Sequence, residues 1–199
     1  MTPQELRARL TEPWTHGKHA DLRGIVCDGR LDLSGCAVAG ADLTGAQFPE
    51  GIDASGARFL GLSWFGGVRF GGPADFSAAV FMNDARFEAS RFDGPVRFTG
   101  AEFRGIGRFD GARFDGGADF SDVVSYGNFS LHQVSMAERA SFHGSEWLGG
   151  LWCQDARLPA DADLQDTQVH GRLWLRGGHR GNAVLTAADF GMSFGYTYF

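Results

Sequence analysis

Histidine and cysteine are the side chains best suited to bind a metal or to catalyse a reaction, and this sequence contains few of either. The six histidines are His16, His19, His132, His143, His170 and His179. His16 and His19 have a spacing that zinc could use, but no second pair of ligands follows them. We therefore expect surface histidines, and neither a metal site nor a cofactor.

The three cysteines, Cys27, Cys36 and Cys153, form neither a disulfide framework nor a metal-binding pattern. No nucleophile elbow, phosphate-binding loop or pair of catalytic carboxylates can be recognised. Unpaired cysteines fit a reducing compartment, and the first residues contain no apolar signal region. The sequence thus predicts a cytoplasmic protein that is not an enzyme and has no catalytic residues.

The composition argues against several classes of protein. The chain has 199 residues, with 43% hydrophobic and 21% charged side chains, which is unlike a disordered protein. Its net charge of −6 argues against direct binding of nucleic acid through a basic face. No apolar run approaches the roughly 20 residues that span a bilayer, so we expect no membrane partner. The unusual feature is the abundance of glycine and phenylalanine, 30 and 18 residues.

The phenylalanines recur at regular steps, which must reflect the architecture that positions every other side chain. From residue 76 to residue 120 the steps alternate between five and six residues. These phenylalanines are Phe76, Phe81, Phe87, Phe92, Phe98, Phe103, Phe109, Phe114 and Phe120. A small or apolar residue stands two positions before each of them. Neither the alternation of a flat strand nor the 3.6-residue period of a helix produces this spacing.

The same steps extend the pattern over nearly the whole chain. Forward, they predict inward-facing central residues as far as Leu175, and only Ser125 among these is polar. Backward, with one slip at 71–73, they predict Trp64 as a central residue and continue to Leu22. Fixed-period similarity of this extent indicates a repeat architecture.

Individual units share a small residue, a polar residue and a central leucine or phenylalanine. Examples are 41–45 (Ala-Asp-Leu-Thr-Gly), 85–89 (Ala-Arg-Phe-Glu-Ala) and 112–116 (Ala-Arg-Phe-Asp-Gly). These units resemble the pentapeptide-repeat family, here as a phenylalanine-rich variant with alternating five- and six-residue units. The resemblance implies an all-β fold, a right-handed quadrilateral parallel β-helix whose central residues point inward.

Four sides of alternating length give a coil of about 22 residues. About eight coils at the ~4.8 Å strand spacing would form a rod roughly 40 Å long. The six-residue steps carry glycine and proline, as at Gly94-Pro95 and Gly105. We expect wider corners there, because glycine tolerates a positive φ and proline presets a turn.

A rod of this kind needs covered ends, because an open end exposes unpaired strand edges. Residues 2–5 (Thr-Pro-Gln-Glu) have the signature of a helix start, so 1–19 is expected to form an N-terminal cap with a helix over 2–10. The β-helix is expected to span 20–175. Residues 176–199 are expected to form an irregular final coil and an aromatic C-terminal cap whose last residues fold over the end.

Outward positions sort onto four faces if every coil has 22 residues. One face carries a sparse acidic stripe: Asp75, Asp119, Asp122, Asp163 and Asp166. Two other faces repeat arginine beside an acidic residue, as in Arg91 with Asp93. Exposed pairs of this kind each contribute only about 0–1 kcal/mol, so we expect these faces mainly to keep the rod soluble.

The second half of the chain also presents an expected interaction patch. Its members are Tyr126, His132, Leu148, Trp152, His170 and Trp174. Trp152 and Trp174 lie one coil apart and should stack on the surface. The alternative is a register shifted by one residue, with Trp152 inside and Cys153 outside. Monomeric proteins rarely leave large apolar patches uncovered, so the patch predicts a partner.

Three classes of function fit these features. The first is a non-catalytic, rod-like scaffold that acts through protein–protein interaction. Its partner would be another protein, or a second copy in a homodimer formed through one end or through the patch. The third, in order of preference, is a small-ligand-binding or enzymatic role at the aromatic patch.

The second class follows from the resemblance. Some pentapeptide-repeat proteins mimic duplex DNA, bind DNA gyrase and protect it from quinolones. The net charge and the acidic stripe favour this function for the present chain, whereas the repeated arginines on two faces oppose it.

Overall fold

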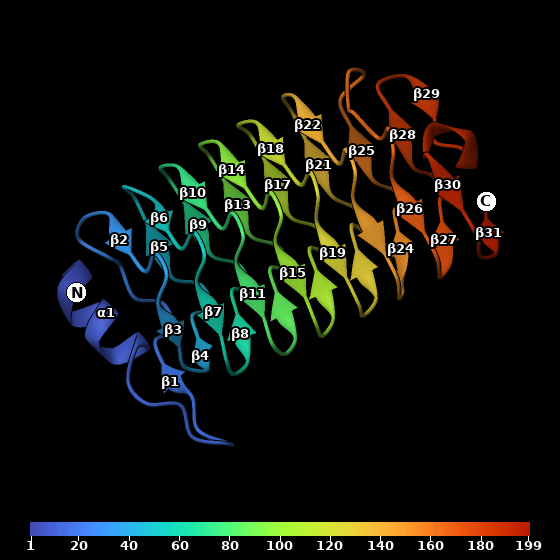
Figure 1. Ribbon diagram of the computed structural model, residues 1–199. Coiled ribbons are helices and arrows are strands. Elements are labelled where there is room, and N and C mark those ends of the chain that lie inside the picture. Colours follow the sequence, from blue (N-terminus) through green and yellow to red (C-terminus); the bar gives the residue numbers. More distant parts are fainter.

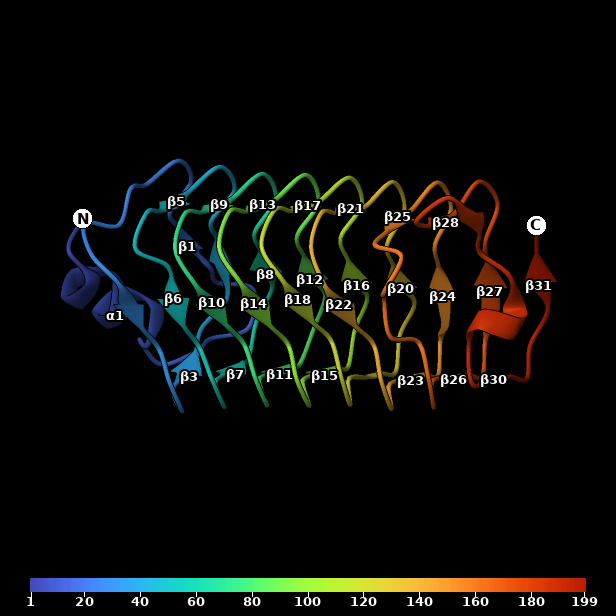
Figure 2. The same cartoon turned by 90° about the horizontal axis from the view of Figure 1, so that it is seen from above.

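The computed structural model describes residues 1–199, which wind into a rod with four sides (Figures 1 and 2). Each side is a sheet of short strands, and neighbouring strands of a sheet come from successive coils and run parallel, except in a hairpin at the C-terminal end. The four sheets are called A to D, and the chain passes through them in the order C, D, A, B. Each coil then returns to the sheet where it began, so Asp75 of one coil pairs with Arg97 of the next. The N- and C-termini lie at opposite ends of the rod (Figure 2). This is the predicted parallel β-helix of about eight coils.

Sheets A and B contain nine and eight strands. Sheet A consists of β1 (Ala20–Asp21), β4 (Ala41–Asp42), β8 (Ser63–Trp64), β12 (Ala85–Arg86), β16 (Gly107–Arg108), β20 (Phe129–Ser130), β24 (Gly150–Trp152), β27 (Arg172–Trp174) and β31 (Thr197–Tyr198). Sheet B consists of β5 (Gln47–Phe48), β9 (Arg69–Phe70), β13 (Arg91–Phe92), β17 (Arg113–Phe114), β21 (Ser135–Met136), β25 (Arg157–Leu158), β28 (His179–Arg180) and β29 (Ala183–Val184).

Sheets C and D contain six and eight strands. Sheet C consists of β2 (Leu31–Asp32), β6 (Ile52–Asp53), β10 (Ala74–Asp75), β14 (Val96–Arg97), β18 (Ala118–Asp119) and β22 (Ala140–Ser141). Sheet D consists of β3 (Ala37–Val38), β7 (Arg58–Phe59), β11 (Val80–Phe81), β15 (Glu102–Phe103), β19 (Val124–Ser125), β23 (Glu146–Trp147), β26 (Gln168–Val169) and β30 (Met192–Ser193).

A stack of aromatic rings runs along the inside of each sheet. The stacks are Phe76, Phe98, Phe120 and Phe142 on sheet C; Phe59, Phe81 and Phe103 on sheet D; Phe65, Phe87 and Phe109 on sheet A; and Phe48, Phe70, Phe92 and Phe114 on sheet B. Ring centroids within a stack are 4.6–5.4 Å apart. Rings of opposite sheets meet edge to face, as Phe76 and Phe87 do at 5.7 Å. Burial of each ring contributes about 2–3 kcal/mol, so these stacks form the core.

Sheet D contains the polar central residue, Ser125, and its neighbours replace the missing volume. Ser125 is fully buried, and its Oγ donates a hydrogen bond to the carbonyl oxygen of Gly127 at 3.0 Å. Phe129 is also buried and packs edge-on against Phe103, with centroids 5.1 Å apart. Gly107 precedes Phe129 on sheet A, and a Cβ at Gly107 would lie 2.6 Å from the Phe129 ring. The core is therefore kept full by an exchange of volume between neighbouring positions.

The five-residue corners turn through a residue in the left-handed region of backbone space. These corners follow sheets C and A, and examples are Gly100 at φ +65° and Ala89 at φ +54°. A side chain in this conformation costs roughly 1–2 kcal/mol, which is why glycine is frequent there.

The six-residue corners need glycine for a different reason. Gly127, Gly149 and Gly171 follow one another at the corner between sheets D and A, and none has a positive φ. A Cβ at each would come within 2.3–2.6 Å of backbone atoms in the preceding coil. The expectation that these wide corners depend on positive φ is therefore wrong for these positions. Glycine is required because adjacent coils approach too closely for a side chain.

The inward residue of β8's side is Phe65, so the prediction of Trp64 as a central residue was wrong. Phe65 is 1% exposed, whereas Trp64 is half-buried and points outward. The cause is a misplaced step: Phe59 to Phe65 is an ordinary six-residue step, and no slip occurs at 71–73. The short coil lies earlier, where one residue fewer separates Val38 from Leu43.

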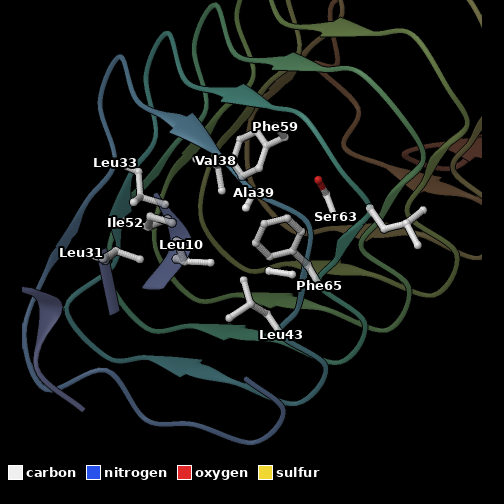
Figure 3. Close-up of a pocket in the computed structure, with 12 residues that line it drawn as sticks. Leu10, Leu31, Leu33, Val38, Ala39, Leu43, Ile52, Phe59, Ser63 and Phe65 are labelled. Atoms are coloured by element: carbon white, nitrogen blue, oxygen red, sulfur yellow. The ribbon is translucent and has the colours of Figure 1, made fainter. Parts of the chain in front are cut away.

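The N-terminal end is covered by α1 (Pro3–Leu10), as predicted from its first residues. The Thr2 hydroxyl accepts a hydrogen bond from the Glu5 amide, and the Glu5 carboxylate accepts one from the Thr2 amide. Leu6 and Leu10 are buried against the first coil. Beneath Leu10, aliphatic side chains together with Phe59 and Phe65 leave a cavity of about 10 Å³ (Figure 3), whose lining is apolar except for Ser63 and offers too few polar partners to hold a water molecule.

The C-terminal end departs from the regular coil. β28 and β29 form an antiparallel hairpin, which a short 3-10 helix, η1 (Ala187–Asp189), follows. Leu185 and Phe190 are buried at this end. The aromatic residues after them do not fold over the end: β30 and β31 continue sheets D and A, and Tyr196 and Phe199 are exposed. None of the helices has the length and apolar character that a membrane span requires.

We predict that Gly107→Ala lowers the free energy of unfolding by about 1–3 kcal/mol, because the new Cβ would overlap the Phe129 ring. Gly66→Ala is the matched control, since the nearest atoms to a Cβ there lie 3.9 Å away and its φ is not positive. Urea unfolding followed by circular dichroism measures both. Equal losses for the two variants would contradict the proposed exchange of volume.

We predict that Cys153 does not react with a thiol reagent at pH 8 until the protein unfolds. Complete burial raises the pKa of the Cys153 thiol to about 12, so roughly one molecule in 10,000 carries the thiolate at this pH. Cys36 is only partly buried and should be labelled first. Mass spectrometry of labelled peptides gives the result, with Cys153→Ala as the control. Rapid labelling of Cys153 would instead support the shifted register, with Trp152 inside.

Candidate interaction surface

An aromatic column lies on the outside of sheet A toward the C-terminal end. Trp152, Trp174 and Tyr198 are paired in register in β24, β27 and β31. The Trp152 and Trp174 rings are 6.2 Å apart and 15° from parallel, and the Trp174 and Tyr198 rings are 4.1 Å apart and 11° from parallel. Cys153 is buried behind Trp152. Trp152 therefore points outward, and the register is not shifted by one residue.

A second column follows the edge of sheet D, one residue past each inward central residue. Its members are Tyr126, Leu148, His170 and Phe194. Tyr126 and Phe194 are 53% and 61% exposed, and the His170 and Phe194 rings stack with centroids 4.8 Å apart. We call the two columns together the aromatic surface.

The two columns stand on either side of one wide corner. Gly149, Gly171 and Gly195 occupy that corner beside Leu148, His170 and Phe194. Because these glycines have no side chains, the corner itself stays low, and the residues that project between the columns are Arg172 and Tyr196, which are both exposed. The corner presents two rows of aromatic and apolar groups, with these two side chains between them.

The structure divides the patch expected from the sequence. Tyr126, Leu148, Trp152, His170 and Trp174 all belong to the aromatic surface. His132 lies beyond it, on the opposite flank of sheet A, where its Nδ1 is 3.1 Å from the carbonyl oxygen of Gln154. Sequence reasoning missed Tyr198 and Phe194, because the hairpin lengthens the last coil and places them outside a 22-residue step.

The acidic stripe is also divided. Asp75, Asp119 and Asp163 occupy equivalent outward positions on sheet C, and Arg97 and Ser141 take the positions between them. Arg97 lies 3.5 Å from the Asp75 carboxylate. The column is therefore acidic without a break only from Asp32 through Asp53 to Asp75, and Arg97 and Ser141 interrupt it beyond that point.

The other two stripe residues, Asp122 and Asp166, lie in the five-residue corner after sheet C. Both have φ +56°. The His143 ring lies between carboxylates of this region, 3.7 Å from Asp166 and 3.6 Å from Asp163.

Most carboxylates of sheet C accept a hydrogen bond from a backbone amide in the turn that follows them. The Oδ1 of Asp75, Asp119 and Asp163 accepts a hydrogen bond from the amide of Ser77, Ser121 and Gln165, respectively, at 2.9–3.0 Å. Burial raises the pKa of Asp119, but hydrogen bonds, chiefly from Ser121, outweigh burial and leave that pKa below its usual value. These carboxylates have a structural role that is independent of any partner.

Sheet B carries a continuous row of ion pairs. Arg69 and Arg91 lie 2.8 and 2.6 Å from the two oxygens of Asp93, and Arg91 also lies 2.8 Å from Asp115. Burial raises the pKa of Asp93, but the hydrogen bonds from Arg69 and Arg91 lower it by more. Arg69 and Arg91 are thus paired with carboxylates of the rod itself.

No group of three or more histidine, cysteine or carboxylate side chains is arranged to hold a metal ion. His16 and His19, whose spacing suggested zinc, each lie beside an aromatic ring. The ring centroids of His16 and Trp14 are 6.1 Å apart, and those of His19 and Trp64 are 6.0 Å apart. The charged side chains described here form pairs across the outside of the rod.

Comparison with known proteins agrees with this architecture. The sequence matches a family described as pentapeptide repeats in nine copies, at residues 33–80, 55–101 and 76–124. These matched segments begin about one coil apart, as the paired strands of sheet C do. No curated protein is significantly similar to the chain. The aromatic stacks, the four parallel sheets and the matched repeats together show that this chain belongs to the pentapeptide-repeat family.

Proposed function

We propose that this chain is a non-catalytic, rod-like scaffold that binds a protein partner through the aromatic surface. The observation that carries the proposal is the pair of outward columns on either side of the glycine corner. Tyr126 and Phe194 expose more than half of their surface, although nearly all other phenylalanines are buried. Clustered aromatic groups of this kind are typical of the centres of protein interfaces.

The shape of the aromatic surface favours a protein over a small molecule. The rings of Trp152, Trp174 and Tyr198 stack on one another, so they present mainly their edges to solvent, apart from the face of Trp152 on the side of Ser130. A row of edges on a convex corner offers a large partner much contact area and encloses a small ligand poorly. The partner is a different protein or a second copy of this chain.

The rod also keeps the cost of binding low. Trp152 and Trp174 belong to three-residue strands paired on both sides, so their backbone is fixed before a partner arrives. Preorganised side chains lose less conformational entropy on association, which leaves more of the contact energy for affinity.

We predict that Trp152→Ser/Trp174→Ser weakens binding of the partner at least tenfold, because buried tryptophans commonly contribute more than 1.4 kcal/mol each to an interface. Proteins captured by the wild-type chain from a lysate of its source are quantified by mass spectrometry and then tested directly by calorimetry. Analytical ultracentrifugation measures self-association of the same variants.

Arg58→Ser/Arg157→Ser is the matched control, because it removes two exposed strand side chains from sheets D and B. Binding should be unchanged in this control. A folded tryptophan double variant that binds as well as the wild type would exclude the aromatic surface as the interface.

A second candidate function is DNA mimicry directed at DNA gyrase, as in some members of the family. It is supported by the carboxylates of Asp32, Asp53, Asp75, Asp119 and Asp163, which lie along sheet C. The proposal ranks second because the charge is partly compensated: Arg30 lies 3.6 Å from Asp53 and Arg97 lies 3.5 Å from Asp75.

If DNA mimicry is the function, micromolar protein should inhibit supercoiling by gyrase or protect the enzyme from a quinolone. Asp53→Asn/Asp119→Asn should then reduce the effect, because it removes two charges from sheet C while the amide oxygen can still accept the turn hydrogen bond. A wild-type protein without effect on gyrase would remove this candidate.

A further inference from the structure

The outward column of sheet A contains one missing planar group. The column begins with Asp21 and Asp42 and continues along the rod with Trp64, Arg86, Arg108, Ser130, Trp152, Trp174 and Tyr198. Planar groups lie over one another at both ends of this part of the column: the guanidinium of Arg86 is 5.8 Å from the centre of the Trp64 ring, and Trp152, Trp174 and Tyr198 are stacked. At Ser130 the stack is interrupted by a short side chain.

This interruption opens a slot between Arg108 and Trp152. The structure has an open depression of about 430 Å³ there, with Ser130 as its floor. Arg108 and Trp152 each pair with Ser130, so their backbones are two strand spacings apart, about 10 Å. Stacked planar groups lie about 3.5–5 Å from each other, so the slot accepts one planar ring between the two side chains.

The rim of the slot is rich in hydrogen-bond acceptors. The Ser130 hydroxyl donates to Oδ1 of Asp110, and the other carboxylate oxygen, Oδ2, lies at the rim 3.8 Å from Nε of Arg108. Because the carbonyl oxygen of Gln154 can only accept, His132 donates to it from Nδ1. The Nε2 of a neutral His132 is then an acceptor. A ring that enters the slot is best matched if it carries a donor at its edge.

We propose that this slot binds one tyrosine side chain of a protein partner. The ring would stack on Trp152 and lie against the Arg108 guanidinium, and its hydroxyl would donate to Asp110 or His132. An arginine from the partner is disfavoured, because Glu88 and Asp110 already pair with Arg108, each at 3.8 Å. A base of a nucleic acid is disfavoured by the net charge of −6. The inference rests on the proposed protein-binding function and adds the chemistry of one anchoring contact.

The test titrates the full chain with N-acetyltyrosinamide as the probe and measures its binding by two-dimensional NMR. We expect saturable shifts of the Trp152 indole signal and of the Ser130 amide, with a Kd of at most about 10 mM. N-acetylphenylalaninamide, which lacks the hydroxyl donor, should bind at least threefold more weakly. Adenosine is the second probe, and it tests whether the slot binds a nucleobase instead.

Ser130→Trp fills the gap in the column and should weaken probe binding at least tenfold. Ser135→Trp is the matched control, because Ser135 is the outward strand residue of the same coil on sheet B, between Arg113 and Arg157. If Ser130→Trp does not fold, Trp152→Ser, which removes one wall of the slot, gives the same comparison.

The proposal is overturned by an absence of saturable shifts, by a folded Ser130→Trp that binds the probe like the wild type, or by binding of adenosine without binding of the tyrosine probe. These outcomes are separate from failure of the proposed function. If Trp152→Ser/Trp174→Ser loses the partner while the tyrosine probe does not bind, the interface stands and the slot does not. If the probe binds while no partner depends on the tryptophans, the slot stands alone.

Discussion

The structure depends on the fit of stacked aromatic rings inside a coil whose sides are each only two or three residues wide. Ring centroids in the four stacks lie 4.6–5.4 Å apart, so each ring needs the ring of the preceding coil at nearly the same place. The chain must therefore return to the same point in every coil, which steps of five and six residues in fixed order achieve. Ser125 has no ring, and two neighbouring positions compensate for it: Phe129 fills the space, and Gly107 leaves room for the Phe129 ring.

Because the inward register is fixed, almost every outward side chain has a defined neighbour one coil before it and one coil after it. Arg91 thus joins Asp93 to Asp115, and Arg86 lies over Trp64. The chemistry of a face is then decided by the order of residues along a column rather than by a local motif. Long planar side chains in succession form a stack, and a short one among them opens a slot.

Much of this architecture could be predicted from the sequence, because the inward ring recurs in the chain at a readable spacing. The prediction failed where two aromatic residues adjoin, since Trp64 and Phe65 both satisfy an aromatic position, and only the pairing of Ser63 with Ala41 and Ala85 decides between them. It also missed Tyr198, because the terminal hairpin lengthens the last coil. The slot at Ser130 has no sequence motif, since it arises from the absence of a large side chain between two others.

The fixed positions of the outward side chains make the aromatic surface a better target for a partner than the acidic stripe. A carboxylate such as Asp119 already accepts a hydrogen bond from the next turn, so part of its charge is engaged before any partner arrives. The edges of Tyr126 and Phe194 are exposed to water, and covering them breaks no structural hydrogen bond of the rod. Since the sheets hold both columns rigidly, the free energy of burying these rings is opposed mainly by the loss of overall motion on association. A count of charged residues in the sequence therefore overstates what the acidic face can offer, whereas the aromatic columns keep nearly all of their binding potential for a partner.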